Sequence, residues 1–480
     1  MELPKRWWED ERKALGALLL GAFVARLAVA LTTFVIHKDG ARFTLMARLF
    51  ADGRWDDGLN VWPRMSPLYP ALILGFGSGA AISIVLGTLA VIPIYFLARE
   101  IWDRRVATLA AAAAAFLPDA VRHGAEVMSE APFMFFFFAA MLFVYRASER
   151  ASLLDFGLAG FAGGLAALTR PEGIYVLAAV IVWPVVRGVT LKSWGRRAGG
   201  IAIAAAAFIV VVSPYARWVH EKTGRWDISD SPVIAAVKNK LGLAKTDIVV
   251  PGEAVETAPI AQVSRPVLIE YALTWLKVTG YGLAPFLLLG FFSLKRHWGQ
   301  AFVIVVGAGY ALPPLLNLVV GTWFSARFLL PSMVWLSPVI ALGLLRVAGW
   351  IGRPRLSFAL AALLFAALVA REARPTGLDR RVLADAGDWI RANSTVRPVL
   401  VSMDRRVDHY ADGISEIAEL RFDELQRQVT RTGAEWVVIL PERLPRAEAG
   451  YLDKIERAWT LAKVVEKSKR GGEVRVYRTR

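Results

Sequence analysis

Long apolar stretches recur along most of this chain, and they constrain its fold more than any other feature of the sequence. They lie at residues 14–36, 71–98, 106–117, 131–145, 154–169, 173–186, 198–213, 269–294, 299–320, 329–345 and 356–370. A helix needs about 20 apolar residues to cross a lipid bilayer, so the shorter stretches must borrow flanking residues or tilt. We therefore predict an all-α polytopic membrane bundle of about 11 transmembrane helices.

The composition agrees with a membrane protein and excludes several classes of enzyme. Of the 480 residues, 56% are hydrophobic and the mean hydropathy is +0.44, which is too apolar for an ordinary soluble domain. The chain has no cysteine, so disulfides, thiolate metal sites and cysteine nucleophiles are excluded. The formal charge is +16, but the basic residues form short clusters between the apolar stretches, which does not favour nucleic-acid binding.

The basic clusters also predict an orientation in the cytoplasmic membrane. Lysine and arginine near the ends of spans favour the cytoplasm, and clusters at 99–105, 146–150 and 187–197 follow every second stretch. This pattern places the N-terminus of a multi-pass protein in the cytoplasm. The outer side then holds the loop at residues 37–69 and the long loop at 214–268. We interpret the long loop as a lid over the substrate, and the alternative is a disordered linker.

The chain changes character after residue 374. Helix-like runs such as DRRVLADAGDWIRAN alternate with the strand-like runs PVLVSM, EWVVILP and GEVRVYRTR, which is typical of a small α/β domain. We predict a transmembrane domain at residues 1–374 and a soluble α/β domain at residues 375–480. An odd number of spans places this tail on the extracytoplasmic side.

The loop at residues 37–69 is the first long polar segment, and we interpret it as an active-site loop. It places Asp39 at the end of the first apolar stretch, where partial desolvation can tune the acidity of a carboxylate. Phe43, Met46 and Phe50 follow at helical spacing, which predicts an amphipathic helix. Asp39 is the candidate for a catalytic base, and the alternative is that it only caps this helix.

Basic side chains mark the outer ends of three apolar stretches, namely Arg64, Arg170 and Arg327. A guanidinium can hold a phosphate through two hydrogen bonds, so this set predicts an anionic, lipid-linked substrate. Tyr69, in the same segment as Arg64, is a further candidate for binding the donor phosphate. As alternatives, Arg64 contacts lipid headgroups, and Arg170 forms a structural ion pair with Glu172 at a helix break.

A short outer segment before the fourth stretch contains His123, Glu126 and Glu130. The two glutamates are four residues apart, so we expect them to share one helix face. Either is a candidate second acid, or both hold a cation together with His123, although the spacing matches no strict metal motif. Helix capping is an equal alternative. The sequence identifies no metal and leaves a divalent cation open.

With these residues placed, the chain resembles the GT-C superfamily of membrane glycosyltransferases. Within that superfamily it is similar to the bacterial relatives of dolichyl-phosphate-mannose protein mannosyltransferases and of the lipid A aminoarabinose transferase. The matching pieces are Asp39 after the first stretch, RMSPLYP before the second, SEAPF before the fourth, LTRPEG, and ARFLLP near the last spans. Their order and spacing cover most of residues 14–345.

The resemblance implies an inverting glycosyltransferase in which Asp39 is the base and Arg64, with Arg327, holds the phosphate of a polyprenyl-phosphate sugar. Protein mannosyltransferases have a second acid beside the first, whereas this chain has Gly40, so a protein acceptor is in question. We predict an enzyme that moves a monosaccharide from this donor to a glycan, lipid or protein on the extracytoplasmic face. No nucleotide is required, because the leaving phosphate needs only positive charge.

Two other functions are compatible with the sequence. A transporter or flippase of lipid-linked sugars needs charged residues along a path through the membrane, and Arg26 is the main ionisable residue at mid-span. A non-catalytic assembly subunit would use its tail to bind a partner. In that case activity would be lost on deletion of the tail but not with Asp39→Asn.

Overall fold

The computed structural model describes residues 11–61, 66–191, 194–224, 226, 266–320, 324–444, 450–466 and 473–479. The chain divides into two compact units. The helical unit comprises Met1–Ala30, Arg64–Lys245 and Val263–Arg374, and the mixed unit comprises Leu31–Pro63, Thr246–Gln262 and Pro375–Arg480. Most of the polar loop predicted at residues 37–69 therefore shares its unit with the tail and not with the spans that flank it in sequence.

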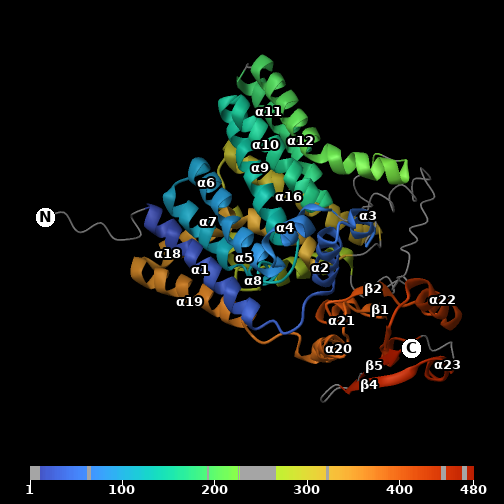
Figure 1. The fold of residues 1–480 in the computed structure, drawn as a ribbon. Coiled ribbons are helices and arrows are strands. Elements are labelled where there is room, and N and C mark those ends of the chain that lie inside the picture. The colour runs from blue at the N-terminus through green and yellow to red at the C-terminus, as the bar shows by residue number, and fades with distance from the viewer. Residues whose placement is uncertain are drawn as a thin grey trace. The chain divides into compact units, whose positions relative to one another are not determined.

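Within the described residues of the helical unit, all regular secondary structure is helical (Figure 1). They are α1 (Glu11–Leu31), α4 (Leu68–Phe76), α5 (Gly79–Leu89), α6 (Val91–Ile101), α7 (Arg104–Phe116), α8 (Pro118–His123), α9 (Glu130–Arg150), α10 (Leu153–Thr169), η2 (Pro171–Ile174), α11 (Tyr175–Leu191), α12 (Trp194–Thr223), α14 (Val267–Val278), α15 (Ala284–Phe291), α16 (Trp298–Val320), η3 (Ala326–Leu329), α17 (Leu330–Trp335), α18 (Ser337–Ile351) and α19 (Pro354–Glu372). The predicted all-α membrane bundle is confirmed in this coarse form.

Seven helices within the described ranges are long and apolar enough to cross a membrane. They are Glu11–Leu31, Gly79–Ile101, Glu130–Arg150, Pro171–Gly188, Trp194–Lys222, Trp298–Val319 and Pro354–Glu372. An eighth span is obtained if the pair Ala326–Trp335 and Ser337–Ile351, which is bent by 63°, crosses as one. The chain is thus a multi-pass membrane protein.

Each of the 11 predicted stretches is helical, but several do not form one continuous span. The stretch at 106–117 becomes the 13-residue helix α7, and the stretch at 154–169 becomes the 17-residue helix α10. The stretch at 269–294 is divided into α14 and α15 where Gly280 and Tyr281 have positive φ angles. The count of about 11 spans stays a prediction.

Small and aromatic side chains pack the interior of the helical unit. The alanines of α7 at residues 110–115 are almost fully buried, so that α6 and α18 lie against this helix. Phe137 and Phe138 of α9 pack against Tyr310 of α16 and Trp335 of α17. This core fixes the start of α9, which carries Glu130.

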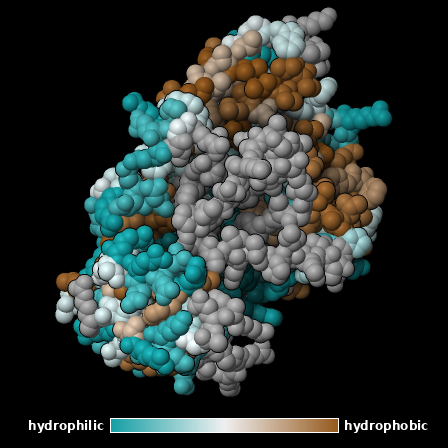
Figure 2. Space-filling model, turned by 90° about the vertical axis from the view of Figure 1, so that its right-hand side faces the viewer, coloured by the Kyte–Doolittle hydropathy of each residue, from teal (hydrophilic) through white to brown (hydrophobic). Residues whose placement is uncertain are grey.

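Large apolar side chains also cover the outside of the helical unit, as expected where helices face lipid. Val210, Leu268, Phe292 and Leu363 are among the exposed ones. Figure 2 shows extensive brown, apolar surface over these helices, whereas the sheet-containing unit is mostly teal and polar. The surface chemistry therefore agrees with a membrane-embedded unit and a water-exposed unit.

The mixed unit combines α2 (Lys38–Ala51) and α3 (Trp55–Asn60) of the first loop with the tail. The tail contains η4 (Leu378–Arg380), α20 (Arg381–Ala392), β1 (Val399–Ser402), α21 (Arg405–Tyr410), β2 (Ile414–Ile417), α22 (Phe422–Thr432), β3 (Trp436–Ile439), η5 (Pro441–Arg443), α23 (Tyr451–Ala458), β4 (Thr460–Glu466) and β5 (Glu473–Arg478). The predicted small sheet region at the C-terminus is confirmed.

The five strands form one sheet in the order β2-β1-β3-β5-β4. The strands β2, β1 and β3 are parallel, and β5 and β4 join them in antiparallel pairings. Strand β3 is buried along its whole length, as expected for a central strand with helices on the sheet faces. Strand β1 leads into α21, and α21 is followed by the edge strand β2.

Candidate functional site

Asp39 is the second residue of α2 and lies in its first turn. His37 is the N-cap, because its Nδ1 accepts a hydrogen bond from the backbone N of Asp39 at 3.2 Å. The alternative that Asp39 is the N-cap of this helix was therefore wrong. The predicted amphipathic helix is present, with Phe43, Met46 and Phe50 buried.

The Asp39 carboxylate lies beside basic groups and is largely removed from solvent. Its Oδ1 is 3.4 Å from Nη1 of Arg42, and its Oδ2 is 3.7 Å from Nδ1 of His37. The Asp39 side chain is 19% exposed, whereas that of Arg42 is only 5% exposed. A buried guanidinium therefore places positive charge next to this carboxylate.

Arg170 organises a second cluster, at the turn between α10 and α11 in the helical unit. Its Nη1 donates to Oε1 of Glu130 at 2.7 Å, and its Nη2 donates to Oε1 of Glu172 at 3.1 Å. Gly173 lets the turn approach α10 closely, because a Cβ there would lie 2.1 Å from the backbone N of Ala167. The sequence LTRPEG thus folds into a tight turn that presents both charges of the ion pair.

Arg327 lies in the same cluster, with its Nε 3.8 Å from Oε1 of Glu130. Both guanidinium groups of the cluster lie over the ring of Phe328, at 6.0 Å for Arg170 and 5.7 Å for Arg327. The structure therefore brings Arg170, Arg327 and Glu130 together, although sequence reasoning had placed the glutamate in a separate group. Because Glu172 is the fourth member, the formal charges of the cluster cancel.

This charge balance bears on the role of Arg170. Two carboxylates already contact its guanidinium, and its side chain is only 13% exposed. A phosphate would have to displace one of these carboxylates to reach it. The geometry therefore favours the structural ion pair for Arg170 over direct donor binding.

The other predicted residues of the helical unit lie in several places. Tyr69 is fully buried, and its hydroxyl bonds to the carbonyl O of Gly79 at 3.0 Å and to Oγ of Ser83 at 2.8 Å. These contacts join α4 to α5 and favour a structural role for Tyr69. Arg64, and residues 227–265 of the predicted lid, lie outside the described residues.

His123 and Glu126 do not form a continuous helix with Glu130. Helix α8 ends at His123 and α9 begins at Glu130, so the predicted shared helix face of Glu126 and Glu130 was wrong. His123 uses its Nδ1 to contact the carbonyl O of Asp119 at 2.8 Å, within its own helix. Over the described ranges, no group of three or more His, Cys, Asp or Glu side chains is placed to hold a metal ion.

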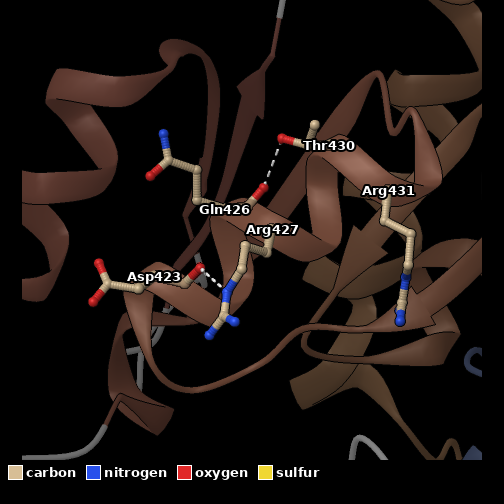
Figure 3. A pocket seen from close by; sticks show the side chains of 5 residues that line it. All are labelled: Asp423, Gln426, Arg427, Thr430 and Arg431. Carbon is tan, nitrogen blue, oxygen red and sulfur yellow. Dashed lines mark hydrogen bonds between the residues drawn. The ribbon is translucent and has the colours of Figure 1, made fainter.

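An open depression of about 590 Å³ lies along α22 in the tail (Figure 3). Its lining residues are Asp423, Gln426, Arg427, Thr430 and Arg431. Arg427 donates to the backbone carbonyl of Asp423, and Thr430 donates to that of Gln426. Some of the hydrogen-bonding groups that line the depression are therefore already used within α22. None of the predicted site residues lines this depression.

Sequence reasoning missed two basic residues of the helix that carries Asp39, namely Arg42 and Arg48. Arg42 follows Asp39 by three residues, and this spacing on a helix is a signal that could have identified it. Arg48, in the last turn of α2, bonds mainly to backbone carbonyl groups of the tail, for which a sequence has no signal. Both lie on α2, which makes this helix the best-defined part of the candidate site.

The broken spans and the small C-terminal sheet make the fold of this chain similar to that of GT-C membrane glycosyltransferases. Residues 72–218 match the family model described as dolichyl-phosphate-mannose-protein mannosyltransferase. No curated protein sequence matches the chain. The family match and the fold together confirm the resemblance that the motifs predicted.

Two solved structures illustrate this similarity. ArnT from Cupriavidus metallidurans bound to undecaprenyl phosphate has a TM-score of 0.62 and 14% sequence identity, covering 96% of this chain and 97% of that one. The archaeal oligosaccharyltransferase AglB from Archaeoglobus fulgidus, in complex with an inhibitory peptide and a dolichol-phosphate, has a TM-score of 0.51 and 13% identity, covering 88% and 69%. At these identities the likeness is one of fold.

Proposed function

We propose that this protein is an inverting glycosyltransferase that uses a polyprenyl-phosphate-linked monosaccharide as donor. The observation that carries the proposal is the fold shared over 96% of the chain with a protein bound to undecaprenyl phosphate. The family match at residues 72–218 supports the same class of activity. The acceptor is a hydroxyl group of a glycan, a lipid or a protein.

Asp39 serves as the general base in this proposal. Its carboxylate takes the proton of the acceptor hydroxyl, and the acceptor oxygen attacks the anomeric carbon from the face opposite the phosphate. The bond between the anomeric carbon and the phosphate oxygen breaks, and the polyprenyl phosphate leaves with the bonding electron pair. The position of Asp39 supports this role, because its carboxylate is partly buried beside the Arg42 guanidinium and so lies in a poorly hydrated place.

The leaving phosphate needs positive charge, and we assign this to Arg64 and Arg327. Arg327 lies at the start of η3 next to an aromatic ring, a setting that suits a guanidinium with part of its hydration removed. Arg170 is assigned the task of holding Glu130 and the turn after α10. The reaction takes place on the extracytoplasmic side, where the lipid-linked donor needs no nucleotide.

The contacts of Arg26 argue against the transporter alternative, for which Arg26 was the main charged residue at mid-span. This side chain is 1% exposed, and its Nη1 donates to the carbonyl O of Ala22 at 3.0 Å and of Ala115 at 3.1 Å. Arg26 thus joins α1 to the end of α7 instead of facing an open path. We therefore prefer transfer over transport.

The substitution Asp39→Asn tests the proposed base. It keeps the size of the side chain and removes its ability to accept a proton, so turnover should fall by roughly 10²- to 10⁴-fold. Transfer is measured with purified protein and a panel of polyprenyl-phosphate monosaccharides, and binding is measured with undecaprenyl phosphate, which should be unchanged. The control is Asp57→Asn, because Asp57 is an exposed carboxylate of the same loop paired with Arg54.

Arg327→Met supplies the complementary arm of this experiment. It removes a charge-assisted contact and should weaken binding of undecaprenyl phosphate by roughly tenfold or more. Should folded Asp39→Asn protein transfer sugar at the wild-type rate with every donor on which the wild type acts, the assignment of the base fails. Should the wild type transfer none of these sugars, the proposed activity itself fails.

A further inference from the structure

The helix that carries Asp39 is attached to the tail at the residues that precede it. The backbone N of Phe34 donates to the carbonyl O of Thr376 at 3.1 Å, and the backbone N of Thr376 donates to the carbonyl O of Thr32 at 3.1 Å. These two bonds form a short parallel bridge between Thr33 and Thr376. The chain that leaves α1 is therefore fixed to the tail before α2 begins.

Tyr410, at the end of α21, holds the next residues. Its hydroxyl accepts a hydrogen bond from the backbone N of Ile36 at 2.9 Å and donates to the carbonyl O of Phe34 at 3.4 Å. Ile36 directly precedes His37, the N-cap of α2. One hydroxyl group of the tail thus fixes the chain three residues before Asp39.

Arg48 holds the other end of α2. Its Nη2 donates to the carbonyl O of His409 at 3.0 Å and lies 2.9 Å from the carboxylate of Asp412, while its Nη1 is 3.5 Å from the carbonyl O of Asp408. These carbonyl groups belong to the last turn of α21, where a cation is favourable. The Arg48 side chain is only 18% exposed, so solvent screens these contacts weakly.

A second ion pair reinforces this end. Asp52 is the C-cap of α2, and its Oδ2 is 2.6 Å from Nη1 of Arg397 in the tail. Arg397 also donates through its Nε to the carbonyl O of Asp412. The helix is consequently held by the tail at both ends, with Asp39 between the two points of attachment.

We propose that the tail is a positioning element for the catalytic base, and that Arg48 is its main positioning residue. This inference rests on the proposed function, because it takes Asp39 as the base. A general base must lie within hydrogen-bond reach of the proton that it removes, and a displacement of about 1 Å can cost about 10²-fold in rate. A tail that fixes both ends of a 14-residue helix supplies this constraint.

The experiment replaces Arg48 with methionine, which keeps the aliphatic stem and removes all the donors. In purified full-length protein, Arg48→Met should lower kcat by roughly tenfold or more, with binding of undecaprenyl phosphate unchanged within about twofold. Hydrogen exchange of residues 36–44 should become faster. The matched control is Arg421→Met. Arg421 is an exposed arginine at the N-cap of α22, and its ion pair is with Glu424 of the same helix and not with α2.

A double substitution separates positioning from a general structural defect. If Arg48 acts through Asp39, then adding Arg48→Met to Asp39→Asn should leave the residual rate unchanged within about twofold, because there is no base left to position. A further tenfold loss in the double variant would overturn the inference. So would a wild-type kcat for Arg48→Met with faster exchange in α2, because the position of the helix would then not matter.

Tyr410→Phe tests the attachment at the other end of α2. Should Arg48→Met fail to fold, Tyr410→Phe removes one hydroxyl at the opposite end and should give the same pattern in milder form, with kcat lowered and donor binding kept. Wild-type exchange and kcat in that variant would overturn the inference. A wild-type rate in Asp39→Asn would instead refute the assignment of Asp39 as the base, and a wild type that transfers no sugar would refute the proposed function. In both cases, exchange in α2 would still report whether the tail holds the helix.

Discussion

At the scale of single residues, Asp404 and Asp408 of the tail are both buried and lie four positions apart, yet their pKa values are shifted in opposite directions. Burial raises the pKa of Asp408 to about 7, although a hydrogen bond from Ser415 and the charge of Arg405 partly oppose this. Burial acts in the same direction on Asp404, but the ion pair with Arg406 outweighs it and lowers the pKa to about 2. Each carboxylate therefore makes the stability of the mixed unit depend on pH.

We predict that Asp408→Asn changes the pH dependence of unfolding. The pKa of Asp408 in the folded chain lies above its ordinary value of 3.8, so between pH 4 and pH 7 the unfolded chain loses a proton that the folded chain keeps. The wild type loses stability as the pH rises through this window. The variant lacks this loss. Between pH 4 and pH 8, its free energy of unfolding should therefore rise by roughly 4 kcal/mol relative to that of the wild type.

Thermal unfolding of the full chain in detergent at these two pH values measures the effect. Asp404→Asn is the control with the opposite sign, because a lowered pKa stabilises the folded chain above pH 4 and this contribution is lost as the pH falls toward 2. An identical pH dependence in wild type and Asp408→Asn would contradict the prediction.

The residues of the candidate site were predictable to different degrees. Asp39 could be singled out because an acid at the end of an apolar stretch is unusual, and Arg170 because it stands beside a proline turn. Arg48 and Tyr410 could not, because they bond to backbone groups 361 and 374 residues away in the chain, and the Asp412 carboxylate that also pairs with Arg48 is similarly distant in sequence. Backbone carbonyl and amide groups are the same for every residue, so a sequence carries no signal for such contacts.

At the scale of elements, two glycines allow α15 and α18 to come into close contact. A Cβ at Gly343 would lie 1.9 Å from the carbonyl O of Phe286, and one at Gly290 would lie 1.8 Å from that of Val339. Helices in membranes associate largely through such packing of small residues, since lipid supplies little hydrophobic driving force. The two positions therefore set the separation of these helices.

We predict that Gly343→Ala destabilises the helical unit by roughly 1 to 3 kcal/mol, because the added methyl group forces the two backbones apart. The control is Gly349→Ala in the same helix, where nothing lies within 4 Å of an added Cβ. The midpoint of thermal unfolding in detergent measures both variants. Equal midpoints would show that α15 and α18 can separate without cost.

Elements were predicted well where periodicity is strong and poorly where backbone geometry decides. The stretch at 71–98 was predicted as one span, but Gly77 takes a left-handed conformation and Ser78 caps a new helix, so α4 is separate from α5. In the tail, β1, β3 and β5 follow the predicted runs. Strand β2 contains the polar residues Ser415 and Glu416, and β4 is mostly exposed, so neither has a distinct apolar pattern.

At the scale of the whole molecule, we predict that the tail lies on the extracytoplasmic side. Because the chain has no cysteine, single cysteines can report this directly. Arg421→Cys in the tail should react with a membrane-impermeant maleimide in intact cells, whereas Arg105→Cys, in a basic cluster predicted to be cytoplasmic, should react only after permeabilisation. The reverse pattern would refute the orientation, and with it the assignment of the reaction to the outer face.

The attachment of α2 to the tail also sets an order of events during synthesis. Ile36 and Arg48 leave the ribosome 374 and 361 residues before the groups that hold them. At about 5 to 20 residues per second, this delay is roughly 20 to 75 s, during which the membrane spans can insert. A growing chain therefore carries Asp39 without its support. Under the proposed function, we expect full transfer activity only after the tail has been translated and has folded.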